Sequence, residues 1–147
     1  MAVETHEIET ETKAGTDVVN ITDKVEALVR KSKIENGHVV VFVQGSTASV
    51  STMEFEPNLV HDLKNVIGKL VPENAPYRHA KTWGDGNGHS HVRATLMGPS
   101  VTIPFEGKRL LLGQWQDIVL IDFDVPSRKR KVFIQITGER TVHSSTK

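Results

Sequence analysis

A short stretch in the middle of the chain gathers three histidines and one acid: His79, His89, His91 and Asp85. Imidazole nitrogens and carboxylate oxygens bind divalent metal ions, whereas the complete lack of cysteine excludes thiolate ligands and disulfide bonds. We expect residues 89–97 to form a strand, because polar and apolar side chains alternate there, and two histidines two residues apart would then share one face. The sequence therefore predicts a metal site held by the three imidazoles, with Asp85 as a fourth ligand or as the group that orients a histidine.

The predicted donor set is typical of a catalytic metal centre. Three imidazoles leave one coordination position for water or substrate, whereas a structural zinc site fills all four positions with protein ligands. We expect zinc, and nickel, cobalt or copper would accept the same donors. The alternative is an inert group of surface histidines. Gly84, Gly86 and Gly88 argue against it, because glycine costs conformational entropy unless the backbone must bend or approach a ligand closely.

Two other interpretations of this stretch fit less well. The Asp85-x-Asn87 start is similar to an EF-hand loop, but the twelfth position is Leu96, where a bidentate glutamate is needed. The glycines follow a Gly-x-Gly-x-Gly pattern, which differs from the dinucleotide-binding fingerprint, and no helix is expected after them.

A second candidate cluster follows a short apolar segment that we expect to be a strand buried on both faces, residues 38–43. Ser46 and Thr47 come at its end, and hydroxyl groups at a strand end can hold a phosphate. Glu54 follows soon after, and a carboxylate beside a metal site can accept or return a proton. We predict Ser46, Thr47 and Asn87 as substrate-binding residues. The predicted acid–base residues are Glu54 and Asp85, and a plain turn rich in hydroxyl groups is the alternative for the second cluster.

Composition limits the partners of the chain. Eighteen basic and eighteen acidic residues cancel without forming a long block of one sign, so we expect no nucleic acid and no anionic membrane as a partner. No apolar run approaches the roughly 20 residues of a membrane span, and the glutamate-rich N-terminus differs from a signal peptide. We therefore expect a cytoplasmic protein whose partners are small molecules or copies of itself. At 147 residues we expect one domain, 1–147, with its core at about 17–140.

The residues above need a scaffold, for which we predict an α+β fold with two helices and mixed or antiparallel sheets. One helix begins near Asp23, with Glu26 in a capping pattern, and ends at Asn36-Gly37. The other begins at Pro57 and ends before Pro72. We predict about seven or eight strands, the clearest of which are 6–13 as an edge strand, 38–43, 48–53, 89–97, 101–105, 110–123 and 132–137. The basic run 128–131 is expected to be a solvated turn.

Several spaced motifs follow one another between about Thr22 and Gly138: Val41-Phe42-Val43-x-x-Ser46-Thr47-Ala48, Glu54, Asp62, Asp85-x-Asn87-x-His89-x-His91, Ser100-x-x-Ile103-x-x-x-Gly107 and Gly113-Gln114-Trp115-Gln116-Asp117-Ile118. In their order and spacing they resemble the YjbQ-like family, also called secondary thiamine-phosphate synthases. The resemblance implies an α+β fold, a homotrimer and a polar cleft of histidines and carboxylates. It also implies a weak activity that joins a pyrimidine pyrophosphate to a thiazole phosphate with release of pyrophosphate.

The chain departs from the family pattern at three places. Gly45 stands where the family usually has the histidine of His-Thr-Thr-Ala, so one histidine of the usual cleft is missing. Met53 stands where an asparagine precedes the glutamate, and Gln114 replaces a threonine. Three hypotheses remain open: a metal-dependent synthase, a metal-assisted hydrolase of a phosphorylated metabolite, and a trimer that binds a metal or a metabolite without catalysis.

Overall fold

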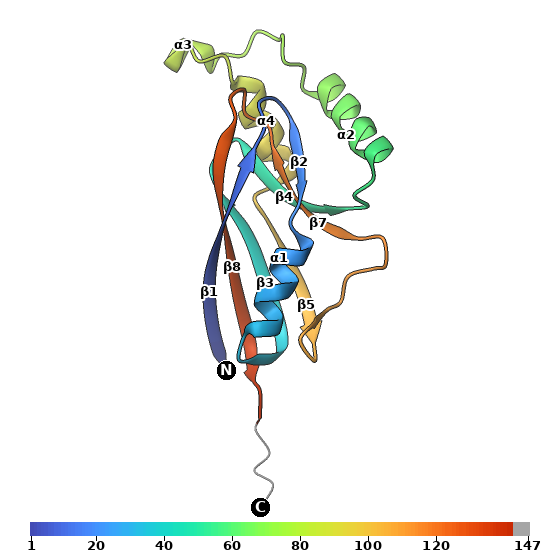
Figure 1. Cartoon of the computed structure of the whole chain (residues 1–147). Helices are drawn as coiled ribbons and strands as arrows, with labels where there is room; N and C mark the ends of the chain where they lie inside the picture. The colour runs from blue at the N-terminus through green and yellow to red at the C-terminus, as the bar shows by residue number, and fades with distance from the viewer. Residues whose placement is uncertain (143–147) are drawn as a thin grey trace, which may run out of the picture.

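A computed structural model describes residues 1–142, and within that range the chain has the predicted α+β fold (Figure 1). Its strands form two antiparallel sheets. The first sheet has, in spatial order, β1 (Ala2–Thr12), β8 (Arg128–Arg140), β3 (Ile34–Gln44), β5 (Ser100–Glu106) and β6 (Arg109–Leu110). The second has β2 (Asp17–Asn20), β7 (Asp117–Asp122) and β4 (Ala48–Met53). The helices are α1 (Thr22–Lys31), α2 (Pro57–Leu70), α3 (Ala80–Trp83) and α4 (Gly88–Met97).

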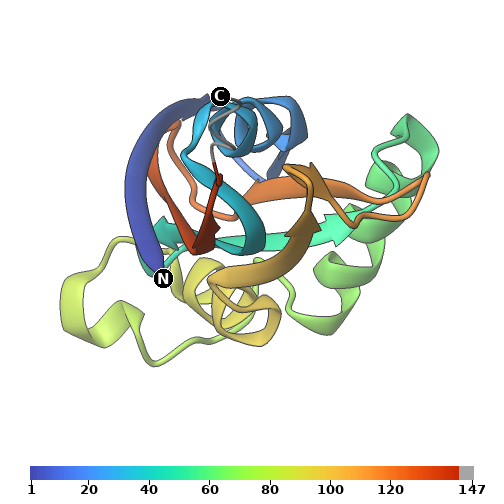
Figure 2. The same cartoon turned by 90° about the horizontal axis from the view of Figure 1, so that it is seen from below.

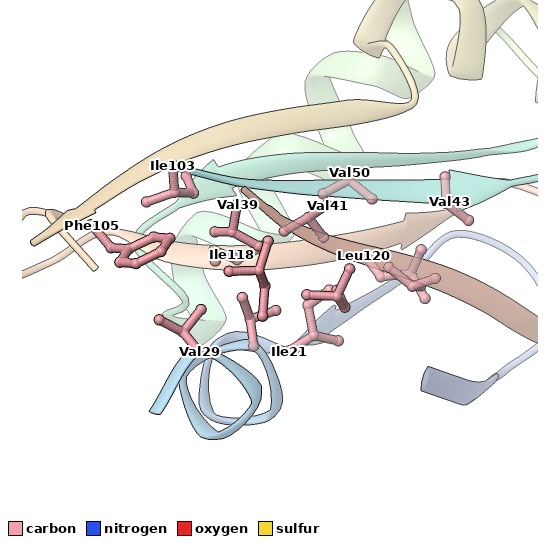
Figure 3. Close-up of a cluster of buried hydrophobic side chains, with 14 of the residues drawn as sticks. Ile21, Val29, Val39, Val41, Val43, Val50, Ile103, Phe105, Ile118 and Leu120 are labelled. Carbon is pink, nitrogen blue, oxygen red and sulfur yellow. The ribbon is translucent and has the colours of Figure 1, made fainter. Parts of the chain in front are cut away.

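The main core lies between the two sheets and α1. Figure 3 shows Val39 and Val41 of β3 facing Ile118 and Leu120 of β7, with Val29 of α1 closing one side. A smaller cluster lies on the other face of the second sheet, where β7 packs against α2 and α4. The second sheet is therefore buried on both faces, and its far face supports the two helices that surround the histidine-rich stretch.

The first sheet is buried on one face only, which corrects the expectation for residues 38–43. Val39, Val41 and Val43 are buried, whereas Phe42 is 40% exposed. The physical reason is that no helix within residues 1–142 covers the outer face of this sheet, so successive side chains alternate between core and solvent. β1 forms one edge of the sheet, as predicted, with Glu7, Glu9 and Glu11 exposed.

α1 ends earlier than the sequence predicts. The helix stops at Lys31, and Gly37 lies inside β3. A side chain there would collide with the neighbouring strand, because an added Cβ would lie 1.9 Å from the carbonyl oxygen of Thr137. Gly37 is therefore required by the close approach of β3 to β8 and does not end a helix. The predicted capping pair does not cap the helix: Ile21 occupies the N-cap position without a side-chain capping bond, and the first helical amide, that of Thr22, donates to Asn20 Oδ1 at 3.0 Å.

Residues 89–97 form most of the helix α4, so the predicted strand is wrong. The apolar residues Val92, Ala94 and Leu96 alternate in the sequence, but the structure buries Ala94 and leaves the other two exposed. Tertiary contacts explain the helix: the Arg93 guanidinium donates to the Val71 carbonyl at 2.9 and 3.0 Å, which fixes α4 against the end of α2.

Among the helices within residues 1–142, none combines the length and the apolar character that spanning a membrane requires.

The predicted strand 110–123 is also divided. β6 ends at Leu110 and β7 begins at Asp117, and the segment between them is irregular. Gln116 closes a turn there by accepting a hydrogen bond from the Gly113 amide at 3.0 Å. The apolar pattern predicted one continuous strand, but this local side-chain contact divides it into two.

Candidate functional site

The segment between α2 and α4 forms the loop that carries the candidate residues, and it includes α3 (Figure 1, top). Gly84 ends α3 with φ of 71°, and Gly86 has φ of 66°, a region that favours glycine. Gly88 begins α4, where an added Cβ would lie only 2.6 Å from Tyr77 Cβ. Two glycines thus let the loop turn, and the third lets it pack against the start of α4.

The structure brings His79, Asp85 and His91 together. The rings of His79 and His91 have centroids 4.5 Å apart and are tilted by 42°. Asp85 Oδ1 lies 3.7 Å from His79 Nδ1, and the His79 and Asp85 side chains are 30% and 49% exposed. Two imidazoles and one carboxylate therefore lie at a solvent-accessible position at the N-terminal end of α4.

His89 does not share a face with His91, so that part of the metal prediction is wrong in this chain. Two residues apart on a helix, side chains are related by a rotation of about 200° and so point to nearly opposite sides. His89 is 3% exposed, with its ring centroid 6.4 Å from that of Tyr77. Within residues 1–142, no three His, Asp or Glu side chains already converge as a metal site.

Burial lowers the pKa of His89 below its ordinary value, and the positive charge of Arg93 lowers it further. Glu73 and Asp124 act in the opposite direction but do not outweigh these effects. The His89 imidazole is therefore neutral near pH 7 and can both donate and accept a hydrogen bond.

Three buried polar atoms of the loop and of α4 lack a hydrogen-bond partner within residues 1–142: His79 Nδ1, Asn87 Oδ1 and His89 Nδ1. Asn87 occupies the N-cap position of α4 and is 9% exposed, yet its side chain makes no capping hydrogen bond. An unpaired buried polar atom costs about 1–3 kcal/mol, so such atoms are rare in native proteins. Three such atoms lie in this loop and in the first turn of α4, which indicates a place where a ligand could form the missing hydrogen bonds.

The second predicted cluster is divided between two environments. Thr47 is 5% exposed and its hydroxyl is already used, since it accepts from Arg130 Nη2 at 2.6 Å and donates to Asp124 at 3.2 Å. Ser46 is exposed and lines a hollow of about 280 Å³ beside α4. Glu54 is exposed after the end of β4, and within residues 1–142 it makes no hydrogen bond or ion pair. Only Ser46 of this cluster therefore remains open to a substrate near α4.

Sequence reasoning missed a buried ion-pair network next to this cluster. Arg130 is 8% exposed and binds Asp122 through two hydrogen bonds of 2.7 and 2.8 Å. Burial raises the pKa of Asp124, but hydrogen bonds from the Val125 amide and from Arg128 outweigh it and hold the pKa below the ordinary value. The predicted solvated turn at 128–131 is wrong, because all four residues belong to β8, and Arg130 shares the inward-facing parity of Val132 and the apolar residues after it. The alternation along this strand could have predicted the burial of Arg130 from the sequence.

The same network fills the space beside Gly45. Gly45 has φ of 139°, which side chains rarely allow. An added Cβ would lie 2.7 Å from Arg130 Nη1, so the guanidinium takes the space that a larger residue would need.

Comparison with known proteins identifies relatives over nearly the whole chain. The family model described as UPF0047 protein YjbQ-like matches residues 6–139. A UPF0047 protein of Archaeoglobus fulgidus is 35% identical over 129 residues, covering 88% of this chain and 98% of the relative.

Solved structures give the same result. A crystal structure of a YbjQ-like protein of unknown function from Sulfolobus solfataricus has a TM-score of 0.89 and 33% identity, covering 94% of this chain and 99% of the other. A hypothetical protein from Aeropyrum pernix has a TM-score of 0.86 and 36% identity, with coverage of 92% and 99%. The motif order, the fold and these matches agree, and the chain belongs to the UPF0047 YjbQ-like family.

Proposed function

We propose that this chain is a metal-dependent enzyme that acts on a small phosphorylated metabolite, with its reaction centre at His79 and His91. The observation that carries the proposal is the pairing of these imidazoles, with ring centroids 4.5 Å apart and the Asp85 carboxylate 3.7 Å from His79. Two imidazoles and one carboxylate are a known ligand set of catalytic zinc sites, which keep one position open.

The donor atoms in the loop fit a divalent ion, for which we propose zinc. His79, His91 and Asp85 would hold it, and the unpaired Asn87 Oδ1 is a further oxygen donor nearby in the chain. These groups do not yet converge within residues 1–142, so binding has to draw the loop together, which the turns at Gly84 and Gly86 would allow. A bound ion would supply positive charge that offsets the charge developing on a departing phosphate group.

The other residues of the site bind substrate. Because Asp85 is a ligand of the ion in this proposal, the acid–base role is not assigned to it, and Glu54 makes no hydrogen bond or ion pair within residues 1–142 that would place it at the histidine pair. Ser46, exposed beside α4, would orient a phosphate oxygen. The neutral His89 would act as a hydrogen-bond partner of the bound substrate.

The reaction we propose is the coupling of a pyrimidine pyrophosphate to a thiazole phosphate, because the chain resembles the secondary thiamine-phosphate synthases. The thiazole nitrogen would form a bond to the pyrimidine methylene carbon while the bond from that carbon to pyrophosphate oxygen breaks. Pyrophosphate would leave with the bonding electrons. Hydrolysis of a single phosphorylated substrate is the second candidate, and it is favoured by the 49% exposure of Asp85, which gives water access to the histidine pair.

We also propose that the protein assembles as a homotrimer. α2 carries Val66 and Leu70, which are 53% and 70% exposed, beside a hollow of about 290 Å³ lined mainly by apolar residues of α2, β4 and α4. Exposed apolar surface of this kind is typical of sites where subunits meet. Sedimentation equilibrium of the full chain tests this assembly, and a monomeric mass would exclude it.

Metal analysis of protein purified without a histidine tag tests the reaction centre. We expect the wild type to retain an ion that His79→Ala and His91→Ala lose, because each variant removes one imidazole ligand. His61→Ala is the matched control, since that side chain is 81% exposed on α2 and lies 3.9 Å from the exposed Asp62 carboxylate. Equal metal content in all four proteins would exclude the metal centre.

Product analysis then separates the two reactions. The synthase requires both substrates and forms a carbon–nitrogen bond, whereas the hydrolase releases phosphate from one substrate and water. Turnover of neither kind by the metal-loaded wild type would leave binding without catalysis as the function.

A further inference from the structure

The end of the molecule opposite α3 contains a second concave surface. There, the last turn of α1, the turn between β5 and β6, and the end of β8 lie together (Figures 1 and 2). They enclose a hollow of about 450 Å³, within the range of about 300–1,000 Å³ that is usual for small-molecule sites. We call it the basic hollow, and its lining residues are Arg30, Ser32, Lys33, Lys108, Arg140 and Thr141.

The lining of the basic hollow is positively charged. It contains four cationic side chains and no acid, and none of the four forms an ion pair with another residue of 1–142. Acids lie close to it: Glu35 accepts a hydrogen bond from the Thr141 hydroxyl at 3.3 Å, and Glu26 and Glu4 line adjoining hollows of about 250 and 260 Å³. Like charges around one cavity repel each other, so an anion bound there would be stabilised.

Lys108 has a structural task that sets it apart from the other three cations. Its φ is 61°, and its ammonium group donates to the carbonyl oxygens of Ser32 and Ile34, beyond the end of α1. The Ser32 hydroxyl is also used, because it donates to the Val29 carbonyl at 2.7 Å. The hydrogen-bond donors that remain for a ligand are therefore the guanidinium groups of Arg30 and Arg140 and the ammonium group of Lys33.

The positions of these three cations are set by backbone contacts. Lys33 donates its amide hydrogen to Glu4 at 2.7 Å and its carbonyl accepts from the Thr141 amide at 2.9 Å. Arg140 lies opposite Ile34 at the end of the pairing between β8 and β3. Arg30 lies in the last turn of α1. The strand pairing and the helix thus fix the backbone positions of the three residues around one opening.

We propose that the basic hollow is a binding site for a small polyphosphate anion, such as the phosphate chain of a nucleotide or of another polyphosphate metabolite. Three free cations match a ligand that carries about three negative charges, whereas a single carboxylate would leave most of the repulsion in place. Guanidinium groups such as those of Arg30 and Arg140 bind phosphate oxygens through paired hydrogen bonds. The site is distinct from the histidine pair, because the two lie at opposite ends of the molecule (Figure 1).

Isothermal titration of the full chain with inorganic tripolyphosphate, in the presence of a metal chelator, tests the proposal. We expect saturable binding by the wild type that weakens as sodium chloride is added, because salt screens exposed charges. Arg30→Gln with Arg140→Gln should bind about 100-fold more weakly, at about tenfold for each guanidinium removed. Neither arginine side chain makes a hydrogen bond within residues 1–142, so this variant should fold normally, as circular dichroism would verify.

Two further variants locate the binding. Lys64→Gln with Lys69→Gln removes the same charge from the exposed surface of α2 and should bind like the wild type. His79→Ala with His91→Ala should also bind like the wild type, which separates this site from the proposed reaction centre. No binding by the wild type, or equal binding by the arginine variant, would overturn the proposal. Loss of binding only in the histidine variant would also overturn it and would assign the anion to the reaction centre.

Discussion

Two groups of polar side chains, the network around Arg130 and the histidine loop, differ in how far their hydrogen bonds are satisfied. Arg130 is bound by both oxygens of Asp122 and by Thr47, all three of them buried. In the loop and the helix that follows it, His79 and Asn87 each keep a buried atom without a partner within residues 1–142. Because burial without a partner costs about 1–3 kcal/mol, the first group avoids that cost and the second bears it. The difference indicates which polar residues hold the structure and which are available to a ligand.

The largest effect is expected from Asp122→Ala. This change leaves the Arg130 guanidinium buried without its main partner, which should cost about 3–5 kcal/mol in the free energy of unfolding, measured by urea denaturation. The double variant Asp122→Ala with Arg130→Met should recover part of that loss, because no buried charge remains uncompensated. A loss below about 1 kcal/mol in the single variant would show that the network does not stabilise the fold.

A smaller effect is expected from Thr47→Val. The change keeps the shape of the side chain but removes its hydrogen bonds with Arg130 and Asp124, at a cost of about 1–3 kcal/mol. Ser46→Ala is the neighbouring control, and it should change stability by no more than about 0.5 kcal/mol because Ser46 is exposed. Equal losses in the two variants would contradict the different environments seen for these neighbours.

The smallest effect is expected from protonation of His89. Its pKa in the folded protein lies below the unfolded value of 6.5, so the folded state binds the proton less readily than the unfolded state. The resulting stability is complete above pH 6.5 and is lost as the pH falls through the folded pKa, with a slope of at most about 1.4 kcal/mol per pH unit. Urea midpoints measured across this interval should fall less in His89→Gln. An identical pH profile in that variant would assign the dependence to another group, and Asp124 cannot supply it, because its contribution is lost only below pH 3.8.

Local signals in the sequence predicted much of the scaffold. Pro57 marked the start of α2, and the predicted strands 48–53 and 132–137 correspond to β4 and to part of β8, where burial alternates along the strand. The same rule failed at Val92, Ala94 and Leu96, because the helix there depends on contacts of Arg93 with a distant part of the chain, and a sequence pattern does not contain them.

The candidate site was predicted less completely for a related reason. The prediction grouped His79, Asp85 and His91, which lie near one another in the structure. The direction of the His89 side chain depended on whether residues 89–97 form a strand or a helix. Arg130 could have been found, since it has the same parity as Val132 on β8, whereas its partner Asp122 lies on another strand and could not be inferred locally.

The acidic edge strand β1 has a consequence for how the protein behaves at high concentration. One side of this eleven-residue strand pairs with β8, and the other side offers backbone groups to any strand of another molecule. Glu7, Glu9 and Glu11 project from it, so two copies approaching through this edge would repel each other. Acidification that neutralises the glutamates would remove that repulsion, and fibrous aggregation through β1 is the expected form of self-association in acid.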